Sequence, residues 1–556
     1  MKKYLLLVVI CFAMLPVIKS QPGPAYAFRV KFKDKNGTLS FADSLQILSP
    51  KALQRRHHHL IGLDSTDLPI VQHYIDTVMI VGNALRLQAK SKWFNQIVIV
   101  NKDSAKSADI AALPMVESVQ LVARWANGVF KTEDPYSKSK FPEPTPLSQK
   151  TSGTSAFYGL SFQQIDQIEA DCLHDIGYMG EEMDIAVFDA NFRYTNTCGA
   201  FDSIRTNGKI KYTYNIARDT SFVYATNINT SHGMNVLGCM AAYLPGTYVG
   251  SAPLANYFLY ITEDMLVEQP VEEDNWLHAA EHADSSGVYL INSSLGYNNY
   301  PNPFTSYTYA QMNGTTSLIA RAANMAVAKG IFVVNAQGNE GLNAWHYMLT
   351  PADGDSVFSV GSVDGSGAWG YSGYGPTVDG QVKPDGMAMG RGTSLIGDNC
   401  TVGAANGSSF ASPIMCGAIA CLWQALPHLK NWQIRNLVTM SSDRYANPNN
   451  THGYGIPNFC IAYNIALGTS DIHHMDYQLA VFPNPVKQDF VIRSFRTGAE
   501  AFQMSIYDIT GAVVAKQPLA YGSEWTIDAL KTVPPGQYIL VLSNATRTFS
   551  TKIMKQ

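Results

Sequence analysis

The sequence has few charged residues and no strong excess of either sign. Only 15% of its 556 residues are Asp, Glu, Lys or Arg, and the formal net charge is −4. This balance gives no electrostatic reason to expect nucleic acid or an anionic membrane surface as a partner. After the first 20 residues, no apolar run reaches the ~18 residues that a membrane-spanning helix needs. We therefore expect no transmembrane segment in the mature protein.

The N-terminus has the pattern of a secretory signal peptide. Lys2 and Lys3 precede an apolar run, and the small residue Ser20 follows that run. We expect residues 1–20 to be removed during export.

Cysteine is scarce and odd in number once the signal peptide is removed. Disulfides persist in an oxidising compartment, so some cysteines can pair, but at least one must stay free. Cys416 and Cys421 lie in a run of small and apolar residues, which favours buried free thiols. The sequence leaves the pairing open among seven residues: Cys172, Cys198, Cys239, Cys400, Cys416, Cys421 and Cys460.

The composition changes along the chain and predicts several domains. Residues 21–130 contain alternating strand patterns and a helix-start serine, which predict a small α+β domain. Residues 131–155 are rich in Pro, Ser, Thr and Lys and predict a cleavable linker. Residues 475–556 form short alternating runs joined by turns, which predict an all-β sandwich.

Residues 156–468 alternate apolar runs with helical patterns. This alternation predicts an α/β domain, a doubly wound and mostly parallel sheet with helices on both faces. Functional residues of such sheets are expected at the carboxyl ends of the strands. The predicted strands lie within residues 183–189, 256–264, 287–296, 330–339 and 357–364, and a helix is predicted at 315–330.

The stretch "NGSSFASPIMCGAIACLW", residues 406–423, predicts a helix that begins between Ser408 and Phe410. Pro413 lacks an N–H group and is tolerated only near the first turn of a helix. Backbone N–H groups at a helix N-terminus are unpaired and can stabilise an oxygen that becomes negative. One of the two serines is therefore a candidate nucleophile, although an N-cap serine is the simpler interpretation.

Three further polar residues are candidates for a functional role because of their positions. Asp189 ends the first predicted strand, where a buried carboxylate is either paired or functional. His232 opens a helix of small residues, and Asn339 lies in a glycine-flanked turn where its amide could donate to an oxyanion. Taken singly, each residue has an ordinary structural interpretation as a turn, capping or packing residue.

Taken together, the motifs "AVFDANF", "SHGMNVLG", "NAQGNEG" and "GSSFASP" resemble the subtilisin-like serine proteases, in which the triad has the same chain order. The resemblance implies that Ser409 is the nucleophile, His232 the base and Asp189 the residue that orients the imidazole. It also implies that Asn339 and the Ser409 N–H form the oxyanion hole, with Ser408 in a supporting role. The fold implied is subtilisin-like.

The motif "SSLG" resembles the strand edge that binds the substrate backbone in this family. It implies that Ser294, Leu295 and Gly296 pair with an extended peptide. Gln337, beside the Asn339 turn, is a candidate for lining the pocket that receives a substrate side chain.

No cofactor is expected, and no metal ligands are assigned. The segment "LPGTYVGSAP" is short and lacks the carboxylates of a calcium loop, which leaves metal binding open. The histidines at 57–59 and the pair His473 and His474 lack a second ligand set at a zinc spacing, so we expect solvated surface positions for them.

The flanking segments also resemble known domains. "RVKFKDKNG", "SPKALQRR" and "SKWFNQIVIV" resemble the prodomains of secreted bacterial relatives, which implies a domain that assists folding and blocks the cleft until it is removed. "VFPNPV" and "PPGQYIL" resemble the C-terminal sorting domain of the type IX secretion system of Bacteroidetes-type bacteria. That resemblance implies export through the periplasm of a Gram-negative bacterium to the outside or the cell surface. An immunoglobulin-like accessory or carbohydrate-binding module remains the alternative.

These observations favour a secreted serine endopeptidase made as a zymogen. Its expected partners are peptide substrates, its own prodomain and the secretion machinery. Two other functions stay open: a catalytically inactive peptide-binding relative, and a serine esterase of the α/β-hydrolase type. The esterase is disfavoured because that fold places its acid and histidine after the serine, and the inactive relative because Asp189, His232, Asn339 and Ser409 are all present.

Overall fold

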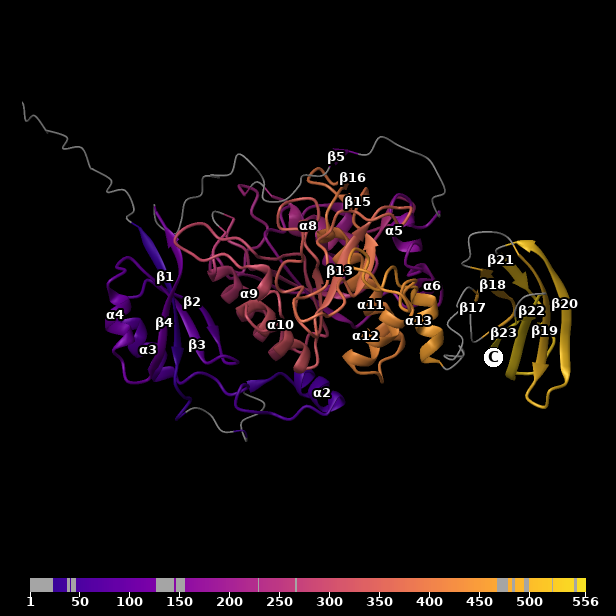
Figure 1. Cartoon of the computed structure of the whole chain (residues 1–556), viewed down its shortest axis with the longest axis horizontal. Coiled ribbons are helices and arrows are strands. Elements are labelled where there is room, and N and C mark those ends of the chain that lie inside the picture. The colour runs from indigo at the N-terminus through magenta and orange to yellow at the C-terminus, as the bar shows by residue number, and fades with distance from the viewer. Residues whose placement is uncertain are drawn as a thin grey trace, which may run out of the picture.

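The computed structural model describes residues 24–37, 41, 47–126, 145–146, 156–228, 230–265, 268–467, 479–482, 486–494, 500–522, 524–544 and 548–556. The predicted signal peptide, most of the predicted linker, and His473 and His474 lie outside the described residues. An N-terminal domain, a central domain and a C-terminal domain follow one another along the long axis of the molecule (Figure 1).

The N-terminal domain is a four-stranded antiparallel sheet with helices packed on it, as the predicted α+β domain requires. Phe28 and Val30 alternate along one strand and pack against Ile75 of a helix. The strands, in the spatial order β2-β3-β1-β4, and the packed helices are β1 (Ala25–Phe32), β2 (Arg86–Ser91), β3 (Gln96–Asn101), β4 (Val116–Trp125), α3 (Gln72–Val81) and α4 (Lys106–Ala111).

The central domain contains a seven-stranded sheet of order β14-β13-β12-β11-β6-β10-β7, in which every pair is parallel. All five predicted strands are present, and the two at the edges of the sheet, β7 and β14, were not predicted. The strands are β6 (Asp184–Asp189), β7 (Ile210–Asn215), β10 (Asn256–Ile261), β11 (Leu290–Ser293), β12 (Phe332–Ala336), β13 (Phe358–Val363) and β14 (Gly386–Met389).

Helices cover both faces of this sheet, which confirms the doubly wound prediction. α8 (His232–Ala241) and α11 (Ser408–Ala425) contribute to the apolar core on one face. α9 (Val271–Ser286) and α10 (Leu318–Ala328) contribute to the core on the other face. The remaining elements of the domain are α5 (Phe162–Asp166), α6 (Asp171–Asp175), η2 (Gly199–Phe201), α7 (Asp202–Thr206), β8 (Tyr243–Leu244), β9 (Tyr248–Val249), η3 (Tyr309–Gln311), β15 (Thr393–Ile396), β16 (Val402–Ala405), α12 (Asn431–Met440) and α13 (Phe459–Ala466); β5 (Thr145–Pro146) pairs with β16.

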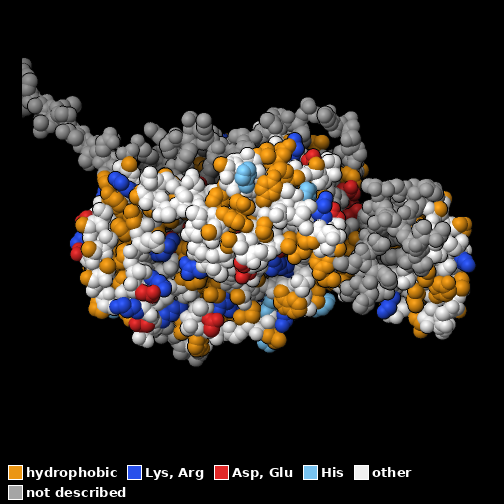
Figure 2. Space-filling model, viewed as in Figure 1, with side chains coloured by type: hydrophobic (Ala, Val, Ile, Leu, Met, Phe, Trp, Pro, Cys, Tyr) orange, Lys and Arg blue, Asp and Glu red, His pale blue; other side chains and the backbone are white. Residues whose placement is uncertain are grey.

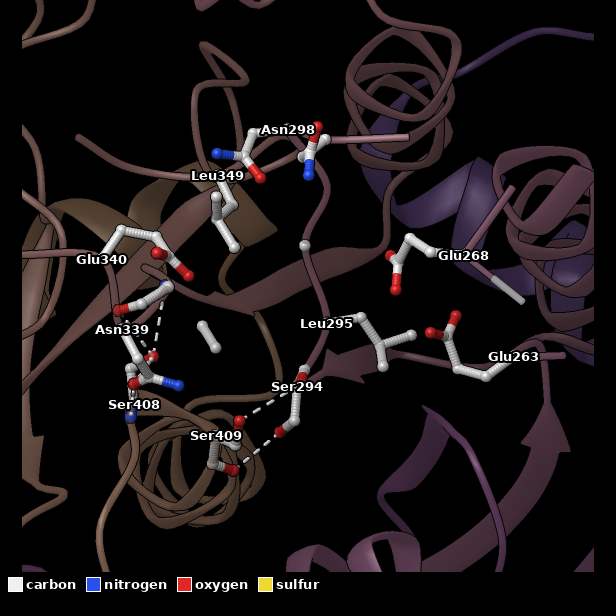
Figure 3. A pocket seen from close by; sticks show the side chains of 14 residues that line it. Glu263, Glu268, Ser294, Leu295, Asn298, Asn339, Glu340, Leu349, Ser408 and Ser409 are labelled. Carbon is white, nitrogen blue, oxygen red and sulfur yellow. Dashed lines mark hydrogen bonds between the residues drawn. The ribbon is translucent and has the colours of Figure 1, made fainter. Parts of the chain in front are cut away.

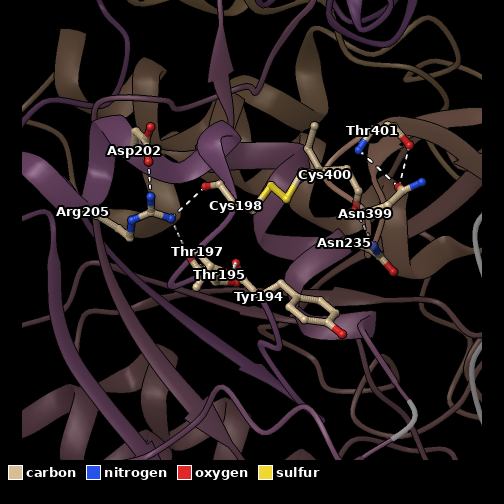
Figure 4. The surroundings of a disulfide bond; sticks show 11 residues. Tyr194, Thr195, Thr197, Cys198, Asp202, Arg205, Asn235, Asn399, Cys400 and Thr401 are labelled. Atoms are coloured by element: carbon tan, nitrogen blue, oxygen red, sulfur yellow. Dashed lines mark hydrogen bonds and ion pairs between the residues drawn. A yellow bond between two sulfur atoms is a disulfide. The ribbon is translucent and has the colours of Figure 1, made fainter.

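Two disulfides tie distant parts of the central domain together. Cys172 of α6 bonds to Cys460 of α13, across 288 residues of sequence. Cys198 bonds to Cys400 in the turn between β15 and β16, across 202 residues (Figure 4). Each bond therefore links segments whose proximity only the folded domain creates.

The other three described cysteines, Cys239, Cys416 and Cys421, are free and buried, which confirms that at least one thiol stays unpaired. Burial raises the pKa of the Cys239 thiol to about 12 and also raises the pKa of the thiols of Cys416 and Cys421. Because the thiolate is the reactive form, these cysteines act as small apolar residues in the core.

The N-terminal domain is fastened to α9 by ion pairs and hydrogen bonds. Arg29 Nη2 lies 2.6 Å from Asp274 Oδ2, and both side chains are largely buried. The backbone N–H groups of Lys92 and Trp93 donate to the Glu281 carboxylate at 2.7 and 3.0 Å. The sheet of the N-terminal domain therefore docks on one face of α9.

A separate helix, α2 (Pro50–His59), extends from the N-terminal domain beneath the central domain (Figure 1). Ser49 caps it by accepting a hydrogen bond from the Ala52 N–H at 3.1 Å. Arg55 and Arg56 are both buried and both bond to the Asp284 carboxylate of α9. We call residues 48–70, which include α2, the anchor arm.

The prediction that the histidines at 57–59 all lie on solvated surface is wrong for His59. His59 is buried, its Nδ1 bonds to the Arg55 carbonyl at 2.9 Å, and its Nε2 accepts from the Asn431 N–H at 3.1 Å. The last histidine of the run thus faces the central domain, because the helix turns one side of the run inward.

The C-terminal domain is an all-β sandwich, as predicted. Its two antiparallel sheets share one apolar core, and it lies at the opposite end of the molecule from the N-terminal domain (Figure 1). The sheets, in order of pairing, are β17 (Leu479–Phe482), β18 (Phe490–Ser494) and β21 (Glu524–Ile527), then β20 (Val513–Gly522), β19 (Glu500–Asp508), β22 (Gly536–Ser543) and β23 (Thr548–Lys555).

The surface agrees with the modest charge of the sequence. On the face that Figure 2 shows, acidic and basic side chains are interspersed among apolar and neutral polar ones. Among the described residues, no helix has the length and apolar character that crossing a membrane requires.

Candidate active site

Asp189 and His232 meet at the carboxyl end of the central sheet. Asp189 is the last residue of β6, His232 is the first residue of α8, and both are buried. The His232 Nδ1 atom lies 2.7 Å from Asp189 Oδ1. A carboxylate that accepts the Nδ1 proton holds the imidazole in the tautomer whose Nε2 can take up a proton.

The close approach of α8 to β6 depends on Gly233. A Cβ atom at this position would lie 2.6 Å from the Asn191 carbonyl oxygen and 3.2 Å from Asp189 Cβ. Any larger residue would therefore push the start of α8 away from the strand and lengthen the contact between His232 and Asp189.

Ser409 lies at the N-terminus of α11, which begins at Ser408 as predicted. The ring centroid of the next residue, Phe410, is 5.8 Å from that of His232, so the first turns of α11 and α8 lie side by side. Ser409 Oγ donates to the Ser294 carbonyl at 3.4 Å. The Ser409 hydroxyl thus faces the strand end of β11, and the next residue of its helix contacts His232.

Pro413 explains why Ser294 and Ser409 are joined. In an α-helix, the N–H of residue 413 would bond to the carbonyl of Ser409, but proline has no N–H to give. The Ser294 hydroxyl donates to this carbonyl instead, at 2.8 Å. The helix that carries Ser409 is thus pinned to the segment that resembles the substrate-binding edge.

Asn339 and Ser408 form a second junction at the start of α11. Asn339 Oδ1 accepts from the Ser408 N–H at 2.7 Å and from Ser408 Oγ at 3.1 Å. The Ser408 hydroxyl also bonds to the Gly338 carbonyl at 3.0 Å. Because the Asn339 oxygen is held in this way, its Nδ2 group is the end of the amide that can donate elsewhere.

A cleft of about 370 Å³ brings most of the predicted site residues together (Figure 3). It is lined by Ser294, Leu295, Gly296, Asn339, Ser408 and Ser409, among others, whereas Asp189 and His232 are not lining residues. A Cβ on Gly296 would lie 2.6 Å from Leu349 Cβ, so glycine is required where the strand edge passes that side chain.

The prediction that Gln337 lines the substrate pocket is wrong. Ala336, the last residue of β12, faces the cleft, so the next side chain along the extended backbone points to the opposite side. Gln337 is accordingly fully buried, and Glu340 reaches the cleft instead.

The acidic residues of the cleft were not predicted from the sequence. Glu263, Glu268 and Glu340 all line it. Glu263 lies just beyond the carboxyl end of β10, a position that the strand pattern alone could have indicated. Carboxylate oxygens of Glu263, Glu268 and Glu272 lie within 4.8 Å of one another, but three carboxylates alone do not identify an ion, and we assign no metal to them.

The central domain resembles proteins of one known family. The model of the Subtilase family matches residues 180–456. Subtilisin BL of Lederbergia lenta is 27% identical over 299 residues, which cover 53% of this chain and 95% of that protein. Subtilisin NAT of Bacillus subtilis subsp. natto is 30% identical over 302 residues, which cover 53% of this chain and 69% of that protein.

The flanking domains also match family models. Residues 27–139 match the peptidase S8 propeptide domain of Bacteroidota, and residues 480–556 match the secretion system C-terminal sorting domain. These two matches indicate a secreted or cell-surface protein. With the matches across the central domain, they show that the chain belongs to the subtilase family of serine endopeptidases.

Proposed function

We propose that the protein is a secreted endopeptidase, made as a zymogen, that hydrolyses peptide bonds through Asp189, His232 and Ser409. The observation that carries this proposal is the Asp189–His232 hydrogen bond of 2.7 Å beside the N-terminus of the helix that bears Ser409. An imidazole oriented by a carboxylate, next to a serine at a helix N-terminus, is the arrangement that nucleophilic catalysis requires.

In this mechanism Ser409 Oγ attacks the peptide carbonyl carbon and gives its proton to His232 Nε2. The tetrahedral intermediate collapses as His232 passes the proton to the leaving amine, and water then hydrolyses the acyl-enzyme by the same steps. Asp189 stabilises the imidazolium that forms in between. The Asn339 Nδ2 group and the Ser409 N–H, at the positive end of α11, would hold the oxyanion.

The backbone of Ser294, Leu295 and Gly296 would bind the substrate as an added strand. These residues line the cleft beside Ser409 and Asn339, in continuation of β11 (Figure 3). A peptide in extended conformation could therefore present a carbonyl to Ser409 while its neighbouring residues pair with this edge.

The N-terminal domain would act as the prodomain, an intramolecular chaperone and inhibitor. At the end of its last strand, the Arg124 N–H donates to Gln269 at 2.6 Å and Trp125 Nε1 donates to Asp264 at 2.8 Å. These partners neighbour Glu268 and Glu263 of the cleft. The chain thus leaves the domain at the edge of the cleft, which supports self-cleavage within or near residues 131–155.

An active-site probe and a protein digest test the proposal together. We expect a fluorophosphonate to label the mature protein at Ser409 and the same preparation to digest casein. Ester turnover with labelling but no peptide cleavage would support the esterase, and absence of labelling would support the inactive peptide-binding relative.

Replacement of Asn339 tests the oxyanion hole. Asn339→Ala is expected to lower kcat by roughly 10²- to 10³-fold with a small change in KM, because the donor acts mainly on the transition state. Initial rates on a peptide amide at several concentrations give both constants. Asn207→Ala, an exposed asparagine at the end of α7, is the matched control, and equal kcat values for the two variants would contradict the assignment.

A further inference from the structure

The anchor arm contacts the central domain where strands of the sheet begin, whereas the cleft lies where strands end. Lys51 Nζ lies 2.6 Å from Asp184 Oδ2, at the start of β6, and Arg55 donates to the Val288 carbonyl just before β11. Asp189 of the proposed active site is the last residue of β6. A strand of this length spans about 17 to 20 Å. The arm and the proposed catalytic residues therefore lie at opposite edges of the sheet.

The turn between α10 and β12 supplies a further contact with the arm. Lys329 Nζ lies 3.1 Å from a carboxylate oxygen of Asp64 and 3.1 Å from one of Asp67. A Cβ atom on Gly330 would lie 3.2 Å from His59 Cγ, so the turn and the arm pack closely. The charge and the shape of this turn are therefore complementary to those of the arm.

The turn between α11 and α12 supplies the most directional contact. Asn431 is the first residue of α12, and N–H groups in the first turn of a helix have no partner within the helix. His59 Nε2 accepts from the Asn431 N–H at 3.1 Å. Burial lowers the pKa of His59 to about 4, so the ring is neutral near pH 7 and can accept this hydrogen bond. The arm thus supplies an acceptor for an N–H group that α12 itself cannot satisfy.

The cleft and the arm contacts share no residue in the part of the chain that the structure describes. All 14 residues that line the cleft lie in the central domain, between Glu263 and Ser409. An arm in place therefore gives no steric reason to exclude a peptide from the cleft. The principal partners of the arm are Asp184, Asp284, Val288, Lys329, Gly330 and Asn431.

We propose that these six residues form a second docking site for the N-terminal domain, the arm site, which binds residues 48–70 independently of the cleft. The inference rests on the proposed function only in treating the N-terminal domain as a prodomain. The arm site fits a basic helix in which His59 follows Arg55 and Arg56 by one turn, because this spacing brings the three side chains to one side of α2. A peptide in the cleft and an arm at the arm site would be bound by one molecule at the same time.

Paired substitutions in the histidine run test the arm site. The Ser409→Ala protein, with an affinity tag on its N-terminal domain and a specific protease site inserted within residues 131–155, is cut and captured at a series of dilutions. His59→Phe should raise the concentration at which half of the remainder is lost by about 10- to 100-fold, since it leaves the Asn431 N–H without an acceptor. His57→Phe, at an exposed position of the same run, should change that concentration less than twofold. Equal release by the two variants would contradict the arm site.

Occupation of the cleft tests the independence of the two sites. The wild-type protein, cut at the same inserted site, is reacted with a peptidyl phosphonate, which fills the substrate edge and bonds covalently to Ser409. Mass spectrometry measures the labelling. The labelled protein should lose its N-terminal domain at a concentration within threefold of that for the Ser409→Ala protein, and a larger increase would overturn the independence. A failure to label Ser409 would count against the endopeptidase proposal instead, and the comparison of His59→Phe with His57→Phe would still decide the arm site.

Discussion

Ser409→Ala is expected to lower kcat by roughly 10⁶-fold, and His232→Ala by a similar factor, which is the magnitude measured for the corresponding losses in subtilisin. Each change removes a member of a unit that acts together, because an unactivated serine is a poor nucleophile and an imidazole without its serine has no proton to take. Active-site titration followed by initial rates on a peptide amide would measure the loss.

The double variant distinguishes this mechanism from two independent contributions. The kcat of the double variant Ser409→Ala/His232→Ala should lie within about tenfold of that of either single variant, since both residues serve one step. The same Ser409→Ala protein should also keep residues 131–155 uncut when it is isolated in pure form. Normal maturation of this variant, without added protease, would exclude self-cleavage.

Asp284→Asn is expected to weaken the docking of the N-terminal domain by about 3 to 5 kcal/mol. The Asp284 carboxylate is fully buried and bonds to Arg55 and Arg56 of the anchor arm, the second at 2.7 Å. Loss of the negative charge removes the carboxylate that the buried Arg55 guanidinium binds, whereas Arg56 keeps the Asp67 carboxylate at 3.0 Å. The corresponding increase in Kd is roughly 10²- to 10⁴-fold.

A cleavable linker allows this docking to be measured. A site for a specific protease, inserted within residues 131–155 of the Ser409→Ala protein, would cut the chain without changing either domain. After the cut, the N-terminal domain should elute with the remainder during size-exclusion chromatography, and Asp284→Asn should release it at low micromolar concentration. Asp109→Asn removes an exposed ion pair with Lys106 and serves as the control. If the N-terminal domain still elutes with the remainder in both variants at the same dilution, the anchoring role is contradicted.

The parts of the fold that the sequence predicted are those that depend on local patterns. The start of α11 at Ser408 follows from the position of Pro413, and the five inner strands are apolar enough to be read singly. β7 was missed because an edge strand is only half buried and carries polar residues. β14 was missed because four residues beginning with glycine form too short a pattern.

The parts that escaped prediction depend on contacts between distant segments. Two adjacent arginines ordinarily indicate a solvent-exposed position. Arg55 and Arg56 are nevertheless both buried, because Asp284 lies opposite them. The same holds for the disulfide pairs, whose partners are separated by 288 and 202 residues. At the cleft, the motif containing Asn339 was recognised, but the inward turn of Gln337 and the exposure of Glu340 follow from the direction in which β12 ends.

The bond between Cys172 and Cys460 closes a covalent ring that contains Asp189, His232, Asn339 and Ser409. A single nick at any surface turn inside this ring opens it but separates no fragment, because the two new pieces stay joined through sulfur. Proteases are exposed to their own attack, and here one accidental cut would leave the four residues of the proposed active site on one covalently connected molecule. The disulfide also cannot form until Cys460 has reached the oxidising compartment. The ring therefore closes only after nearly all of the central domain has been exported.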